Sequence, residues 1–282
     1  MFSDILLAVD YDRTLTAPDS SLPQRNIEAI EYFIANGGAF TVNTGRSLPM
    51  AQPFMGKVPL SAPLLLYNGS AAYDTEQGCF SHAYPIELDA KAFVSHLQEL
   101  FPDLIVEVQA LDAHYALREN PDWERFSENG GCRWGYTDPE HIPQPFLKVS
   151  LNGDCSGHTM KYMYQATEAE TARMKEAIAT VERLYGDKVE VFHSVPKIVD
   201  IHAKGVSKLH SARDLQKTLG RKWLVCVGDA HNDLTMLRGA DFAYCPSDGS
   251  IADQFENVCD CGSGAVADVI YYKIPEILKN KP

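Results

Sequence analysis

The fold of this 282-residue chain is decided by one stretch near its start, Ile5-Leu6-Leu7-Ala8-Val9-Asp10-Tyr11-Asp12-Arg13-Thr14. Its apolar residues run without alternation into Asp10, a pattern typical of a strand buried on both faces of a parallel sheet. In open α/β sheets ligands bind beyond the carboxyl ends of the strands, so Asp10 and Asp12 are expected at the mouth of a site. The alternative is a solvated turn, in which aspartate is a common residue.

The spacing of these two aspartates suits acid–base and nucleophilic chemistry. At positions i and i+2 beyond a strand, two carboxylates can point the same way. One could attack as a nucleophile, because carboxylates form phosphoryl-enzyme intermediates. The other could protonate a leaving oxygen and later accept a proton from water.

The next segments alternate between helix and strand patterns. Ser21 and Pro23 favour the start of a helix, which Gly37-Gly38 would end. Strands are expected over 39–43 and 63–67, which predicts a parallel sheet with helices on its faces. The first of these strands ends at Thr44, whose hydroxyl is suited to hold a phosphoryl oxygen. A cap on a short following helix is the alternative role for Thr44.

The pattern changes after residue 82. Helices are expected over 88–100 and 167–185, and strands over 104–108, 146–151, 189–192 and 197–202. This order predicts a separate α+β domain inserted into the first one. We therefore expect a core formed by residues 1–82 and 197–282 and an inserted domain over 83–196.

The strand and helix alternation then resumes. Ser207 is expected to cap a helix that runs to Leu219, and an apolar strand over 223–227 leads into Gly228-Asp229-Ala230-His231-Asn232-Asp233. A strand over 242–245 and a last helix interrupted near Pro275 follow. Lys208 could be an ordinary surface lysine, and Asp229 and Asp233 a loop acid and a helix cap.

Composition excludes several classes of protein. The formal net charge of −13, with no basic run, argues against a nucleic-acid or anionic-membrane surface. No stretch approaches a membrane span or has the form of a signal peptide. The seven cysteines are scattered, which favours free thiols in a reducing compartment, and hence a cytoplasmic location.

Four motifs in order resemble those of the haloacid dehalogenase-like (HAD) phosphohydrolases, and specifically the Cof-type branch. They are Asp10-Tyr11-Asp12-Arg13-Thr14, Thr44-Gly45-Arg46, Gly205-Val206-Ser207-Lys208 and Gly228-Asp229-Ala230-His231-Asn232-Asp233. Tyr67-Asn68-Gly69-Ser70 is similar to a stretch that this branch carries before its inserted domain. The resemblance covers the whole chain and implies a doubly wound, Rossmann-like α/β core with an inserted α+β cap of the C2 type.

The resemblance implies a role for each motif residue. Asp10 would be the nucleophile that forms an aspartyl-phosphate, and Asp12 the acid/base. Thr44, Gly45 and Lys208 would hold the phosphoryl oxygens. The residues that would bind Mg²⁺ are Asp10, the backbone carbonyl of Asp12, and Asp229, supported by Asn232 and Asp233. Arg13, Arg46 and Asn68 are candidate substrate contacts in the core, as are Arg125, Arg133 and the aromatic residues of 123–136 in the cap.

Electrostatics give a separate reason for a cation and a lysine at this site. Four carboxylates and a phosphate dianion in one cleft would repel each other strongly at low effective dielectric. A hard, oxygen-liganded Mg²⁺ and an ammonium group reduce that repulsion and stabilise charge on the transferring group.

The resemblance implies a Mg²⁺-dependent phosphatase of a small phosphorylated metabolite, with sugar phosphates ahead of pyridoxal phosphate or nucleotides. A phosphomutase is one alternative, although related mutases lack the Thr-Gly-Arg motif. A catalytically idle metabolite-binding protein is another, although such proteins usually lose a catalytic acid. Arg13 departs from the branch, which usually has glycine there, and leaves the conformation of that loop in question.

Overall fold

The computed structural model describes residues 1–280, and the chain divides into two compact units. The first comprises residues 1–45, 54–82 and those from Ser207 onward, and the second comprises residues 46–53 and 83–206. None of the helices within 1–280 is both long and apolar enough to cross a membrane.

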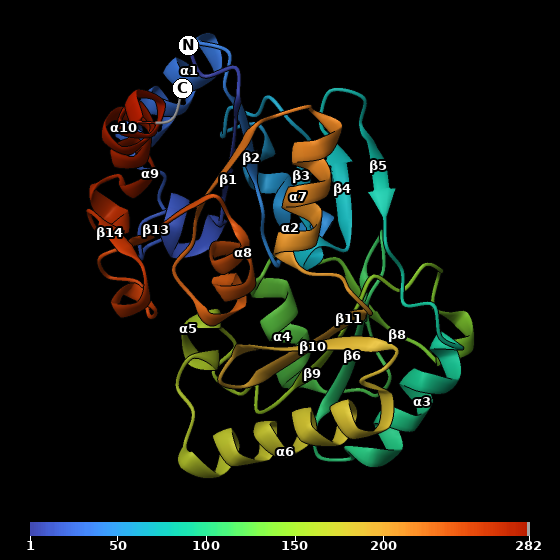
Figure 1. The fold of residues 1–282 in the computed structure, drawn as a ribbon. Coiled ribbons are helices and arrows are strands. Elements are labelled where there is room, and N and C mark those ends of the chain that lie inside the picture. Colours follow the sequence, from blue (N-terminus) through green and yellow to red (C-terminus); the bar gives the residue numbers. More distant parts are fainter. Residues whose placement is uncertain (281–282) are drawn as a thin grey trace. The chain divides into compact units, whose positions relative to one another are not determined.

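The first unit is built on a five-stranded sheet in the order β14-β13-β12-β1-β2 (Figure 1). The strands are β1 (Ile5–Val9), β2 (Ala39–Val42), β12 (Trp223–Val227), β13 (Phe242–Pro246) and β14 (Glu256–Val258). All four neighbouring pairs are parallel. Every residue of β1 is buried, as its uninterrupted apolar sequence predicts for the centre of a parallel sheet.

Helices cover this sheet and complete its core. They are α1 (Gln24–Ala35), α7 (Lys208–Thr218), α8 (Leu234–Gly239), α9 (Ala265–Asp268) and α10 (Ile274–Asn280). Leu6 and Ala8 of β1 share one apolar cluster with α7 and α8. Leu7 and Val9 point to the opposite face, because side chains alternate along a strand. The predicted doubly wound α/β core is confirmed.

The third predicted strand is shorter than expected and belongs to a different sheet. β3 (Leu64–Leu66) starts a three-stranded sheet with β4 (Ala71–Asp74) and β5 (Cys79–Ala83). One parallel bridge, Asn43 to Leu65, links it to the end of β2. The predicted third strand is therefore present and parallel to β2 at this bridge. Asn68 and Gly69, both at positive φ, then turn the chain back, so β3 also pairs with β4 in antiparallel register.

The second unit contains a six-stranded sheet in the order β10-β11-β9-β6-β7-β8. Its strands are β6 (Ile105–Gln109), β7 (His114–Ala116), β8 (Trp134–Tyr136), β9 (Lys148–Asn152), β10 (Val189–Val195) and β11 (Ile198–Ala203). The predicted boundary after residue 196 is contradicted, because it separates β10 from β11, which pair with each other. β11 also pairs with β9, so residues 197–206 belong to the second unit.

The two faces of this six-stranded sheet differ in chemistry. One face packs on α3 (Ala90–Leu100) and α6 (Glu168–Tyr185) through four valines, one leucine and one isoleucine of β6, β9 and β11. The other face carries buried polar side chains, namely Glu107, Gln109, Lys148, Ser150, Asn152, Asp200 and His202. Two short helices, α4 (Pro121–Asn129) and α5 (Met160–Met163), complete the unit, and α2 (Leu48–Met55) begins in its segment 46–53.

Candidate active site

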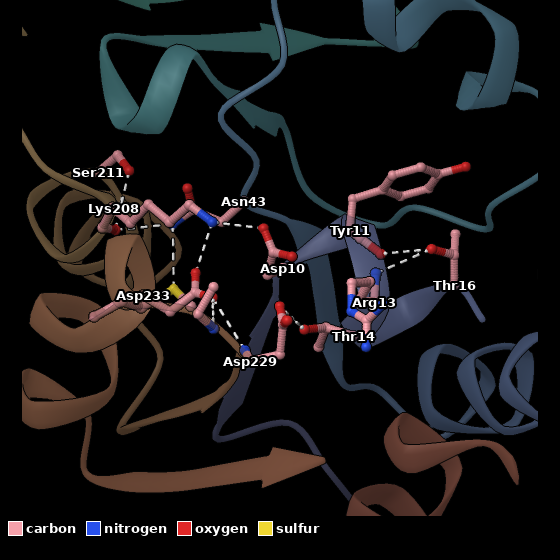
Figure 2. A network of polar contacts seen from close by, with 12 residues as sticks. Asp10, Tyr11, Arg13, Thr14, Thr16, Asn43, Lys208, Ser211, Asp229 and Asp233 are labelled. Atoms are coloured by element: carbon pink, nitrogen blue, oxygen red, sulfur yellow. Dashed lines mark hydrogen bonds and ion pairs between the residues drawn. The ribbon is translucent and has the colours of Figure 1, made fainter. Parts of the chain in front are cut away.

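Three acidic side chains meet at the carboxyl ends of β1 and β12 in the first unit. Asp10 follows β1, and Asp229 follows β12 after one glycine. The two strands are neighbours in parallel register, so their following residues lie side by side, and the N–H of Asp10 donates to the carbonyl of Val227 at 2.9 Å. One carboxylate oxygen from each of Asp10, Asp229 and Asp233 lies within 4.8 Å of the others (Figure 2).

Lys208 joins two of these acids. It is the first residue of α7, which Ser207 caps by accepting a hydrogen bond from the N–H of His210. The Nζ atom of Lys208 lies 2.5 Å from Oδ1 of Asp10 and 2.6 Å from Oδ1 of Asp233 (Figure 2). The lysine is 1% exposed, so the alternative of a surface lysine is wrong.

Asp233 combines the two roles considered for it. Its Oδ2 atom accepts hydrogen bonds from the N–H groups of Asp229 and Ala230, as a capping carboxylate does, while Oδ1 binds Lys208. Gly228 makes this approach possible, since a Cβ atom there would lie 2.6 Å from Cγ of Asp233. The structure therefore requires glycine at position 228 for space.

The turn Tyr11–Leu15 carries the rest of the first motif. Asp12 is half-buried, and Arg13 is exposed with φ of +59°. The buried hydroxyl of Thr14 donates to Oδ1 of Asp229 at 3.1 Å and so links this turn to the acidic cluster. The ring of Tyr11 stacks on Phe54 with centroids 3.9 Å apart.

The second motif follows β2. Thr44 is buried, its N–H donates to the carbonyl of Leu65, and its own carbonyl accepts from the N–H of Asn68. Gly45 lies so close to Asn68 that a Cβ atom added at Gly45 would lie 2.8 Å from Oδ1 of Asn68. The alternative of a helix cap does not apply to Thr44, because α2 begins at Leu48.

Not all predicted residues are gathered in the first unit. Arg46 belongs to the second unit and donates to the carbonyl of Met50 at 3.4 Å. Asn232 is half-buried in the turn before Asp233. In the second unit, Arg125 and Arg133 are exposed, whereas Trp123 is fully buried and donates from Nε1 to Glu107. Trp123 therefore packs in the interior of the second unit and is not exposed to contact a substrate.

Burial and mutual repulsion shift the acid–base properties of the cluster. Burial raises the pKa of Asp10 well above its usual range, although Lys208 opposes this rise. Burial, and then the charge of Asp233, raise the pKa of Asp229 to about 7. Burial alone would lower the pKa of Lys208, but Asp10 and Asp233 outweigh it and raise that pKa. The site therefore holds more negative charge than one ammonium group balances.

The donor set fits a hard divalent cation. Three clustered carboxylate oxygens are the ligands that Mg²⁺ prefers. A cation would relieve the mutual repulsion that, after burial, raises the pKa values of Asp10 and Asp229. The expected set of Asp10, the Asp12 carbonyl and Asp229 remains a prediction. The structure adds the carboxylate of Asp233 to Asp10 and Asp229.

Two residues that support the site were not selected from the sequence. The Nδ2 group of Asn43 donates to the carbonyl of Lys208 at 2.8 Å and fixes the start of α7 against the end of β2. Thr14 binds Asp229. The signal for Thr14 was its place in the first motif, and that for Asn43 was its position just before Thr44 at a strand end.

The comparisons with known proteins agree with this geometry. The family model of the haloacid dehalogenase-like hydrolases matches residues 7–252. The chain belongs to this family. The predictions of the family, of its Cof-type branch and of a hydrolase are thereby confirmed.

Relatives and solved structures match over most of the chain. The 5-amino-6-(5-phospho-D-ribitylamino)uracil phosphatase YbjI of Escherichia coli K12 is 25% identical over 85% of this chain and 83% of its own length. The HMP-PP phosphatase of Escherichia coli O6:H1 is 24% identical over 82% of this chain and 80% of its own. The fold is also that of the HAD subclass IIB sugar phosphatase BT4131, which is 17% identical, covers 95% of this chain and 98% of its own, and gives a TM-score of 0.74.

Proposed function

We propose that this protein is a Mg²⁺-dependent phosphatase that hydrolyses a small phosphorylated metabolite through an aspartyl-phosphate on Asp10. The observation that carries the proposal is the buried cluster in which Lys208 lies 2.5 Å from Asp10 and 2.6 Å from Asp233, with Asp229 in the same group. The family match supports a hydrolase, and the relatives named above act on phosphorylated compounds.

The reaction would proceed in two displacements. Lys208 holds Oδ1 of Asp10, and we propose that Oδ2 attacks phosphorus. Asp12 gives a proton to the leaving oxygen as the bond from phosphorus to the substrate oxygen breaks. Asp12 then takes a proton from the water that attacks the aspartyl-phosphate, which releases phosphate and restores the Asp10 carboxylate.

The remaining residues would position the phosphoryl group and balance its charge. Thr44 would offer its hydroxyl and Gly45 its backbone N–H to the phosphoryl oxygens, together with the ammonium group of Lys208. Asp10, the Asp12 carbonyl, Asp229 and Asp233 would hold Mg²⁺, with Asn232 in support. When bound, the ion would neutralise charge on the transferring phosphoryl group.

A sugar phosphate is the substrate class that we favour, with pyridoxal phosphate and nucleotides as further candidates. The sugar phosphatase of the same fold supports this choice. The second unit would act as the cap, with Arg46, Arg125 and Arg133 as its candidate contacts, and Arg13 and Asn68 as those of the core. A cytoplasmic location is consistent with seven free cysteines in the described part of the chain.

Phosphate release tests the proposal. We would assay a generic aryl phosphate and a panel of sugar phosphates, nucleotides and pyridoxal phosphate, together with the substrates named for the two relatives. Each assay is run with Mg²⁺ and with a chelator, for the wild type and for Asp10→Asn. We expect turnover that needs the metal and is lost in Asp10→Asn. Turnover that survives this substitution would remove Asp10 as the nucleophile.

Two alternatives have their own outcomes in the same experiment. An isomerised sugar phosphate in place of free phosphate would indicate a phosphomutase. Tight binding of a metabolite without turnover across the panel would indicate a binding protein.

A further inference from the structure

A series of buried hydrogen bonds connects three residues of the second unit. Glu107 of β6 and His114 of β7 lie 2.8 Å apart, from Oε1 to Nδ1. The other ring nitrogen of His114, Nε2, lies 2.7 Å from Oγ of Ser47. The three residues are 3%, 2% and 0% exposed, so no solvent molecule competes for these contacts.

Both carboxylate oxygens of Glu107 accept hydrogen bonds. Oε1 of Glu107 also accepts from Nε2 of Gln109, while Oε2 accepts from Nε1 of Trp123 and Nδ2 of Asn152, all at 2.8 to 3.0 Å. A buried carboxylate with four donors is stable only in its ionised form. Glu107 therefore presents a fixed negative charge to His114.

His114 is held as a cation by that charge. Burial alone would raise the pKa of Glu107 and lower that of His114. The attraction between the two groups outweighs burial, and at His114 a hydrogen bond with Cys132 adds to it, which gives pKa values of about 2 and about 9. A doubly protonated imidazole has no acceptor, so Nε2–H must donate to Oγ of Ser47. A charged donor makes this hydrogen bond stronger than one between neutral groups.

Ser47 closes the motif that begins at Thr44. Its carbonyl accepts from the N–H of Ala51 in the first turn of α2. At the other end of the motif, the N–H of Thr44 donates to the carbonyl of Leu65, and the carbonyl of Thr44 accepts from the N–H of Asn68. Backbone hydrogen bonds therefore fix Thr44, and His114 fixes Ser47. Gly45 and Arg46 lie between these two fixed residues.

We propose that His114 is a positioning residue, which fixes Ser47 and thereby the backbone of residues 44–47 in the conformation that binds a phosphoryl group. This inference rests on the proposed function, since it assigns phosphate binding to that motif. Glu107 acts one step further away, by holding the ring of His114.

A double-mutant cycle with inorganic phosphate tests this role. His114→Asn keeps a donor near the Nδ1 position, toward Glu107, and removes the donor toward Ser47. Ser47→Ala removes the acceptor, and Ser47→Thr restores a hydroxyl. The affinity for inorganic phosphate in the presence of Mg²⁺ is measured by calorimetry, which needs no turnover, and Tm reports folding.

We expect each single substitution to weaken phosphate binding roughly tenfold and the double variant to be no weaker than either single one. Ser47→Thr is expected to bind like the wild type. His158→Asn is the matched control, because His158 forms a comparable contact with Asp122 at 2.7 Å in the same unit, and it should leave phosphate affinity unchanged.

Several results would overturn the inference. They are multiplicative losses in the double variant, unchanged affinity in Ser47→Ala, or no phosphate binding by the folded wild type. If His114→Asn fails to fold, the contrast between Ser47→Ala and Ser47→Thr decides. Phosphate binding with the expected pattern, but without turnover of any substrate, would support the positioning role while rejecting the proposed phosphatase.

Discussion

At the scale of single residues, Arg13 is the position where this chain departs from its family branch. Its φ of +59° lies in the left-handed region, which glycine adopts without a steric penalty and other residues adopt at a cost of about 1 to 2 kcal/mol. The sequence showed arginine in place of glycine, and the structure shows that the backbone has kept the conformation that glycine favours.

Arg13→Gly is expected to stabilise the protein by up to about 1 kcal/mol, partly offset by the greater freedom of glycine in the unfolded chain. Arg13→Ala is the matched control, because it removes the same guanidinium group and keeps the strained backbone. Urea unfolding of the three proteins measures the difference. A free energy of unfolding for Arg13→Gly at or below that of Arg13→Ala would contradict the strain argument.

At the scale of elements, the site depends on two glycines that let chain segments approach each other. Gly228 makes room for Asp233, and Gly69 makes room for the start of α7. Gly69 has φ of +99°, and a Cβ atom there would lie 2.3 Å from the carbonyl oxygen of Ser207. That carbonyl belongs to the residue before Lys208. The close approach of Gly69 to Ser207 therefore helps to fix the position of Lys208 in the site.

Gly69→Ala is expected to reduce the free energy of unfolding by about 2 to 4 kcal/mol, through strain and overlap with backbone. Its control is Gly56→Ala, where an added Cβ meets no atom within 4 Å. That control should change stability by less than about 0.5 kcal/mol. Chemical denaturation measures both, and equal effects would show that the overlap relaxes easily.

The polar face of the six-stranded sheet predicts a pH optimum of stability. Glu107 outweighs burial and raises the pKa of His114 from 6.5 to about 9, so its contribution is present below 6.5 and is lost as the pH rises through 9. Burial lowers the pKa of His202 from 6.5 to about 3, so protonation of the unfolded chain removes stability as the pH falls below 6.5. Together these histidines favour a maximum near pH 6.5.

Thermal unfolding across pH checks this expectation residue by residue. From about pH 7 to about pH 9 the wild type should lose Tm more steeply than His114→Asn. From about pH 6 to about pH 4 it should lose Tm more steeply than His202→Asn. Parallel curves for a variant and the wild type would remove that histidine as a source of the pH dependence.

Much of the first unit could be predicted from the sequence because its signals are local. A continuous apolar run identified β1 and β12, and Ser207 marked the start of α7 at the residue where the structure has it. The rule that parallel strands end at one edge indicated that residues following these strands meet, and the resemblance to the family implied which of them form the site. The place of β11 could not be predicted, because it depends on pairing with β9, far away in the sequence.

The contacts that support the site could not be predicted either, because they also join residues that are far apart in the sequence. No local pattern indicates that His114 meets Ser47, or that Asn43 binds the carbonyl of Lys208. Burial of Trp123 was also undecided, since an aromatic residue in a polar stretch fits either a surface contact or a small core.

At the scale of the whole molecule, excess negative charge in the site links metal binding to stability. A ligand that binds only the folded state at one hundred times its Kd stabilises by about 2.7 kcal/mol. We therefore expect Mg²⁺ to raise Tm by several degrees and a chelator to reverse the rise. Asp229→Asn should abolish this response, and Asp19→Asn, which changes an exposed acid, should keep it. A wild-type Tm that is insensitive to Mg²⁺ would argue against the metal site.

The pairing of β1 with β12 also bears on how the protein is made. Ile5 pairs with Trp223 and Val9 with Val227, so the centre of the first sheet joins the beginning of the chain to a segment translated much later. At about 5 to 20 residues per second, β1 waits on the order of 10 to 40 s for its partner on the ribosome. All six strands of the second sheet are synthesised before β12, so that sheet can assemble first. The apolar β1 would meanwhile be a binding site for chaperones on the nascent chain.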